Sequence, residues 1–235
     1  MIWICLLGML PSCQNPNTMD NPVKQVSPAE LYAEPTVELA TAIHSEDDPA
    51  VRQLLASGRF DLGDRGLRNM PLVLYAASLG NYGAMEQLLT AGAPANDQCD
   101  IGYGPMSILE VAVGSKNERF MNLLLDFGAS PDGVNGTDPP LFRAIMTEQW
   151  DRMVRLLDAG ADVNRTNSVG EPPITRLALI DRYDKVLYLL QRGADPNVGT
   201  EVEQDLAGMI AAFPLSPSTE AGQWQQQVKL FLSER

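Results

Sequence analysis

The sequence is poor in the residues on which many binding and catalytic sites depend. Its 235 residues include three cysteines and one histidine, and 17 Lys and Arg stand against 30 Asp and Glu. So few cysteines exclude a disulfide framework, and a single histidine, His44, excludes a histidine-rich metal site. With a net charge of -13, the chain lacks the basic clusters on which nucleic-acid binding depends. We therefore expect neither a nucleic-acid partner nor a metal.

Catalytic motifs are also missing. The sequence contains no His-Glu-x-x-His, no Gly-x-Ser-x-Gly and no phosphate-binding glycine loop. A triad needs a nucleophile, a base and an orienting acid within hydrogen-bond reach, and His44 is the only histidine that could serve as the base. Carboxylates are abundant, so a site built from two of them stays open as an alternative. We predict that the chain is not an enzyme and uses no cofactor.

What the chain does have begins with an apolar start. Residues 2 to 10 are an uncharged, mainly apolar run, too short for a membrane-spanning helix of roughly 20 residues and typical of an export signal. The run ends in Leu10-Pro11-Ser12-Cys13, which resembles the lipobox of bacterial lipoproteins. The resemblance implies a signal peptide over residues 1–12, a lipid on Cys13, and a lipoprotein facing the periplasm from the outer membrane. Cleavage of the signal at another site is the alternative.

Residues 13–35 are rich in Pro, Asn and acidic residues and show no periodicity, as is typical of a flexible tether. About 22 such residues span roughly 25 Å as a random coil and about 75 Å when stretched. We expect this segment to hold the following domain clear of the membrane.

The rest of the chain repeats one pattern, two adjacent leucines with a glycine three residues after the second. The glycines lie 34, 36, 32 and 33 residues apart. Each leucine pair has an apolar residue three or four positions upstream, which predicts an amphipathic helix that the glycine ends. A period of this length predicts a solenoid of stacked helix-turn-helix units. The five glycines are Gly58, Gly92, Gly128, Gly160 and Gly193.

These residues resemble the ankyrin-repeat family. The family's Thr-Pro-Leu-His-x-Ala opening is matched in part by Ser107–Ala112, Pro139–Ala144 and Pro172–Leu177, and its Gly-Ala-Asp-Val-Asn closing is intact at Gly160–Asn164. The resemblance implies an all-α solenoid with hairpin loops over residues 36–235, made of five repeats and a degenerate C-terminal capping helix pair. The family's opening histidine is absent, so we expect stability to rest on the leucine core. The residues in its place are Leu74, Glu110, Phe142 and Thr175.

The resemblance also implies where a partner would bind, because ankyrin proteins commonly use hairpin tips and the exposed side of the inner helices. On the hairpins it selects Arg68, Met70, Tyr103, Met106, Asn135, Asp138, Ser168, Glu171 and Glu201, and on the inner helices it selects Met146. Aromatic residues dominate interface hot spots, so Tyr103 is the expected anchor. Acidic residues near the last hairpin favour a protein partner with a basic rim.

Three hypotheses of function follow. The first is a monomeric protein-protein interaction module in the bacterial envelope, possessing no catalytic groups, that inhibits a toxin or enzyme as an immunity protein. The second is a scaffold or stress-related accessory protein that supports another envelope enzyme. The third, which applies without a lipid on Cys13, is a secreted effector.

Overall fold

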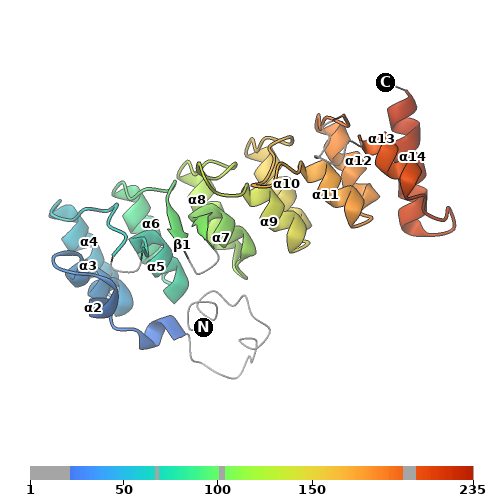
Figure 1. The fold of residues 1–235 in the computed structure, drawn as a ribbon. Helices are drawn as coiled ribbons and strands as arrows, with labels where there is room; N and C mark the ends of the chain where they lie inside the picture. The colour runs from blue at the N-terminus through green and yellow to red at the C-terminus, as the bar shows by residue number, and fades with distance from the viewer. Residues whose placement is uncertain (1–21, 67–68, 101–103, 198–204, 235) are drawn as a thin grey trace. The chain divides into compact units, whose positions relative to one another are not determined.

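A computed structural model describes residues 22–66, 69–100, 104–197 and 205–234 of the chain. Its contacts divide the chain into two compact units, Met1–Thr137 (unit 1) and Asp138–Arg235 (unit 2). Each unit is built from successive pairs of antiparallel helices, as Figure 1 shows. The prediction of an all-α solenoid is thereby confirmed in the arrangement of each unit.

Every pair consists of a shorter or equal first helix, which we call the inner helix, and a second, outer helix. In unit 1 the pairs are α3 (Thr36–His44) with α4 (Asp48–Ala56), α5 (Leu72–Leu79) with α6 (Tyr82–Thr90), and α7 (Ile108–Gly114) with α8 (Glu118–Asp126). In unit 2 they are α9 (Pro140–Met146) with α10 (Trp150–Asp158), α11 (Pro173–Leu179) with α12 (Tyr183–Gln191), and α13 (Leu206–Ala212) with α14 (Glu220–Ser233).

The repeated leucines form the core of the stack. The first leucine of each pair in α6, α8, α10 and α12 is completely buried, because it lies on the face that an outer helix turns to its neighbours. In α4 the pair Leu54 and Leu55 is only half-buried. This helix belongs to the first repeat, so it has a neighbouring repeat on one side only.

Glycines end the outer helices as expected. The five repeat glycines all have positive φ, between 65° and 98°, a region that residues with a Cβ enter at a steric cost. Side-chain caps begin several of the helices. Asp47, Asn81 and Asn117 accept hydrogen bonds from backbone N–H groups in the first turns of α4, α6 and α8.

The long loop of the third repeat contains the only strands among the described residues. β1 (Gln98–Asp100) pairs antiparallel with β2 (Pro105–Ser107), and Cys99 lies opposite Met106. Both of these side chains are buried. The hairpin occupies the loop within the widest glycine spacing, 36 residues, and it is a local addition to the helical stack.

The prediction of a flexible tether is wrong over residues 22–35. This segment forms η2 (Pro22–Gln25) and α2 (Pro28–Leu31), and its side chains Val23, Leu31 and Tyr32 are all buried. The Tyr32 hydroxyl donates a 2.8 Å hydrogen bond to the backbone oxygen of Met70. Three scattered apolar residues produce no periodic signal in the sequence, yet they suffice to attach the segment to the first two repeats.

The last helix pair closes unit 2. Helix α14 packs on α12, and the fully buried Gln225 joins α14 to the loop after α13. Its Oε1 accepts from the backbone N–H of Leu215 at 2.9 Å and its Nε2 donates to the backbone oxygen of Phe213 at 3.0 Å. A polar side chain with both ends bonded can therefore lie inside this pair. The capping helix pair that the resemblance implied is present, and its second helix, α14, is the longer of the two.

Candidate functional site

The loops that follow the outer helices of neighbouring repeats are tied together by side chains. In unit 1, Asn96 accepts from the backbone N–H of Ser130 at 2.6 Å; in unit 2, Asn164 accepts from that of Asp195 at 2.8 Å. Each asparagine therefore fixes the next such loop along the stack. These amide bridges, which the sequence alone did not indicate, link neighbouring repeats that lack the family's opening histidine.

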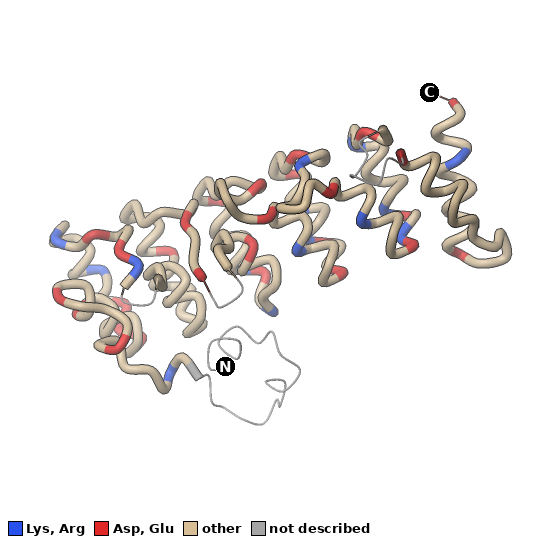
Figure 2. Tube along the Cα trace, viewed as in Figure 1, with Lys and Arg blue, Asp and Glu red and all other residues tan. Residues whose placement is uncertain are grey.

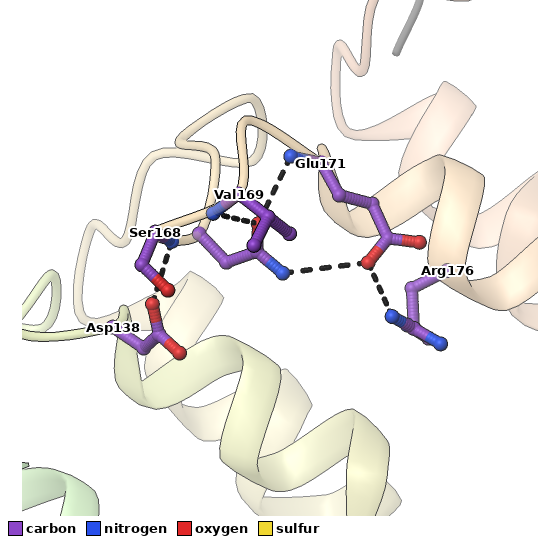
Figure 3. Close-up of polar contacts among 6 residues, drawn as sticks. Asp138, Ser168, Val169, Glu171 and Arg176 are labelled. Atoms are coloured by element: carbon purple, nitrogen blue, oxygen red, sulfur yellow. Dashed lines mark hydrogen bonds and ion pairs between the residues drawn. The ribbon is translucent and has the colours of Figure 1, made fainter. Parts of the chain in front are cut away.

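The hairpin between α10 and α11 is held by a denser polar network (Figure 3). Asp138 accepts from the backbone N–H of Ser168 at 2.7 Å, and Asn167 accepts from those of Val169 and Glu171 at 3.1 and 2.9 Å. Glu171 in turn forms a 2.5 Å ion pair with Arg176 of α11. At the tip of this fixed loop, Val169 is 74% exposed. The network presents an apolar side chain on a rigid support.

Three predicted contact residues are not on the surface. Met70 and Met106 are buried apolar side chains, and Glu171 is buried within its ion pair with Arg176. The expectation that they are exposed is wrong: Met106 lies in the β1–β2 pair opposite Cys99, the Met70 backbone oxygen accepts from Tyr32, and Glu171 pairs with Arg176. Their contribution is to shape the loops and not to offer side chains to a partner.

The structure leaves other predicted residues accessible. Asn135, Met146 and Ser168 are exposed and Asp138 is half-buried, so their binding role stays a prediction. Cys13, Arg68, Tyr103 and Glu201 lie outside the described residues.

The inner helices of unit 2 end in exposed apolar side chains. Met146 and Leu179, the last residues of α9 and α11, are 60% and 55% exposed, and Phe213 directly after α13 is 65% exposed. Phe213 was not among the predicted contacts. The sequence did contain a signal for Phe213. It lies 33 residues, one repeat period, after Ile180, the residue that follows α11.

Several acidic residues that suggested a steering field have structural tasks. Asp205 caps α13 by accepting from the backbone N–H of Gly208 at 2.7 Å, and Asp195 accepts from that of Asn197 at 2.9 Å. Figure 2 shows acidic and basic residues interspersed along the elements of each unit. The acidic residues described near the last helix pair therefore do not form a separate cluster free of structural roles.

Reactive groups are engaged or buried. The His44 imidazole Nδ1 lies 2.8 Å from the Tyr75 hydroxyl, and the free thiol of Cys99 is buried. Burial, with the nearby carboxylates of Glu110 and Asp97, raises the pKa of Cys99 to about 12. Across the described ranges, no group of three His, Cys, Asp or Glu side chains could hold a metal ion, and no helix is both long and apolar enough to cross a bilayer.

Comparison with known protein sequences gives a partial match. No model of a known protein family matches the chain. The E3 ubiquitin-protein ligase XB3 of Oryza sativa subsp. japonica is 33% identical over 95 residues, which are 40% of this chain and 21% of that protein. The chain thus spans about a fifth of the length of the curated relative it matches.

Solved structures resemble the chain over most of its length. An ankyrin repeat domain from Acinetobacter baumannii AYE has a TM-score of 0.64 and 19% identity over 83% of this chain and 96% of that one. The ankyrin repeat domain of Bcl-3 has a TM-score of 0.60 and 21% identity over 74% and 78%.

A third structure is the complex of a predatory endopeptidase with an immunity protein from Bdellovibrio bacteriovorus. One of its chains has a TM-score of 0.58 and 18% identity over 83% of this chain and 98% of that one. Taken with the helix pairs, the helix-ending glycines and the tied loops described above, these likenesses establish that the chain has the ankyrin-repeat fold.

Proposed function

We propose that the chain is a protein-binding module of the bacterial envelope that inhibits an enzyme or toxin, as an immunity protein does. The observation that carries the proposal is the exposed apolar side chains at equivalent ends of successive inner helices, Met146, Leu179 and Phe213. Exposed apolar side chains that gather in one patch mark interaction sites in folded proteins, and these three lie at the ends of inner helices that contact one another in succession. A rigid stack holds them in place without any cost for ordering loops.

Inhibition is favoured over a supporting role by one likeness. A chain with the same fold and nearly the same extent occurs in a complex of an endopeptidase with an immunity protein. The likeness is one of fold, and the experiments below identify the partner.

The test begins with recovery of the partner. Photo-crosslinking groups placed at Met146 and Leu179 would be activated in intact cells, and the same group placed at the exposed Leu230 of α14 would serve as the control. The crosslinked protein is then purified and assayed with and without equimolar chain. We expect its activity to be lost; activity that persists or rises would support the accessory role and contradict inhibition.

The proposed lipid anchor is tested separately. We propose that Cys13 carries a lipid, as its lipobox-like surroundings suggest. The folded segment starts at Pro22, so only eight residues, 14–21, separate it from Cys13, and the chain between Cys13 and Pro22 can span at most about 30 Å. Labelling cells with a fatty-acid analogue should mark the wild type and not Cys13→Ala. Equal labelling of both would disprove the anchor, leaving a secreted effector as the alternative.

A further inference from the structure

The exposed apolar side chains of unit 2 form a row with the period of the repeats. Met146 and Leu179 end α9 and α11, while Ile180 and Phe213 occupy the next position after α11 and α13. Helix α11 contacts both α9 and α13, so these helix ends are neighbours in space. We call Met146, Leu179, Ile180 and Phe213 the apolar row.

An acidic residue follows the row in two repeats. Glu148 and Asp181 each lie two residues beyond the end of their inner helix, with left-handed φ values of 51° and 58°. The Glu148 side chain is 63% exposed, and its contact with Arg182 is a distant 3.7 Å ion pair. Arg182 also approaches Asp184 at 3.8 Å and lies over the Trp150 ring. The row therefore has an acidic border with weak internal compensation.

Unit 1 shows how the same positions look when they are covered. Glu46, with φ 56°, is two residues beyond α3, as Glu148 is beyond α9. The chain's own η2 contacts α5, the Val23 side chain of η2 is completely buried, and Lys24 forms a 2.7 Å ion pair with Glu46. Leu79, which precedes its repeat glycine by the same 13 residues as Ile180, is buried. The short helix η2 is the blue turn before α2 in Figure 1.

From this internal precedent we propose that the apolar row of unit 2 docks a segment of the partner protein in which an apolar residue is followed by a Lys or Arg. The apolar residue takes the place that Val23 has on α5, and the basic residue pairs with Glu148 or Asp181 as Lys24 pairs with Glu46. The inference rests on the proposed protein-binding function and names the chemistry of the bound segment. In unit 1 the corresponding place is already occupied by the chain itself.

Two basic residues near the row are already paired with carboxylates of the chain. Arg176 lies three residues before Leu179, but its guanidinium is held by Glu171 at 2.5 Å. Lys185 is 3.2 Å from Asp184 and 5.5 Å from the centre of the Trp150 ring. Both cations thus have acidic partners of their own. Arg182 approaches Glu148 only to 3.7 Å, so the exposed carboxylates of Glu148 and Asp181 stay available to a closer cation from outside.

The test uses a probe taken from the chain. An acetylated and amidated peptide with the sequence of residues 22–26, Pro-Val-Lys-Gln-Val, is titrated into the purified chain, with the methyl groups of Met and Ile labelled for NMR. We expect the Met146 and Ile180 methyl signals to shift while the buried Met153 methyl in α10 does not. A peptide carrying Lys24→Glu should bind about two- to fivefold more weakly, as expected for one exposed ion pair.

Two double variants and one control test whether the peptide binds at the apolar row. Replacing Met146 and Leu179 together with Ser should weaken binding at least about fivefold through lost apolar contact, whereas Leu230→Ser, an equally exposed position, should leave it unchanged. Because surface changes can still disturb folding, the second variant, Glu148→Lys with Asp181→Lys, gives an independent readout. It should reverse the preference, so that the acidic peptide binds better than the basic one.

Other outcomes overturn the proposal. Absent shifts, shifts confined to unit 1, or equal binding of both peptides would each contradict a basic-apolar segment on the row. If the chain dimerises and the Met146/Leu179 variant does not, a second copy covers the row instead. Should the row variants still inhibit the recovered partner fully, the inhibitory function would stand and this docking site would be wrong.

Discussion

At the scale of single residues, Gly66 shows how the amino-terminal segment is seated. This glycine has φ 59°, and a Cβ placed on it would meet the Leu31 backbone oxygen and lie 2.7 Å from Cδ1 of Tyr32. The glycine is therefore required by conformation and by close approach at once. Gly58 has nearly the same φ, 65°, with open space around the position of its Cβ.

This pair permits a controlled measurement. We predict that Gly58→Ala costs about 1 kcal/mol, the price of the left-handed conformation alone. Gly66→Ala should cost at least about 2 kcal/mol more, because the segment at Leu31 and Tyr32 must move as well. Urea unfolding of the two variants measures the difference. Equal destabilisation would show that the segment does not pack against Gly66.

A second prediction concerns the reactivity of Cys99. With its pKa raised to about 12, the fraction of thiolate at pH 8 is about 10⁻⁴. We predict that iodoacetamide leaves Cys99 unmodified in the folded chain at pH 8 and modifies it in urea, as resolved by peptide mass spectrometry. Rapid modification of the folded chain would contradict burial of the thiol.

The same shift has a consequence for stability. The folded state keeps the thiol protonated up to higher pH than the unfolded state, whose pKa is near 8.5. The stabilisation is complete below about pH 8.5 and is lost as the pH rises toward 12. Cys99→Ser, which does not titrate in this range, should therefore show a smaller loss of stability in urea unfolding between pH 8 and 10. An identical pH dependence in both proteins would contradict the assignment.

At the scale of elements, the amino-terminal helices η2 and α2 act as part of the first two repeats. Lys24 pairs with Glu46, Tyr32 bonds to Met70, and the Thr36 hydroxyl donates to the Asp64 carboxylate at 2.6 Å. The Tyr32 ring also packs edge-on against the Tyr75 ring of α5, with centroids 5.5 Å apart. The segment thus covers apolar surface that the terminal repeat would otherwise expose to water.

We predict that shortening one side chain of this segment destabilises unit 1. Leu31→Ala should lower the free energy of unfolding by about 2–3 kcal/mol, since a buried leucine is lost and a cavity remains. The exposed Leu230→Ala should change it by less than about 0.5 kcal/mol. Hydrogen exchange read by mass spectrometry should locate the loss of protection in α3 and α5. If Leu31→Ala behaves like Leu230→Ala, the segment is dispensable.

At the scale of the whole molecule, the net charge of -13 acts on association more than on the fold. A partner that carries Lys or Arg beside apolar residues is attracted over distances comparable to the Debye length, about 10 Å at 0.1 M salt. The attraction accelerates encounter, while apolar contact at the row limits dissociation.

We predict that the association rate with the recovered partner falls by about tenfold between 20 and 300 mM NaCl, while the dissociation rate changes little. Biosensor kinetics at several salt concentrations measure both rates. The Glu148→Lys, Asp181→Lys variant should have a slower association rate and a weaker dependence on salt. An association rate that is indifferent to ionic strength would show that charge does not steer the encounter.

The repeat itself was determined by the sequence. A leucine pair, a glycine three residues later and a period near 33 residues can be satisfied only by helices that end at the glycine and bury their leucines on their neighbours, as Leu124 and Gly128 do. The exposure of Met146 was likewise expected, because the ankyrin resemblance places it on the exposed side of an inner helix. Local propensity and periodicity carry this information because every repeat meets the same constraint.

Tertiary structure decided what does not repeat. Val23, Leu31 and Tyr32 lack any period, so their burial depends on packing between elements: η2 contacts α5, α2 contacts α3, and Tyr32 bonds to Met70, which is 38 positions away. Met70 and Glu171 have the register of exposed hairpin residues, yet both are buried: the Met70 backbone oxygen accepts from the Tyr32 hydroxyl, and the ion pair with Arg176 compensates the charge of Glu171. Which faces stay open is a property of long-range packing, and one repeat's sequence does not contain it.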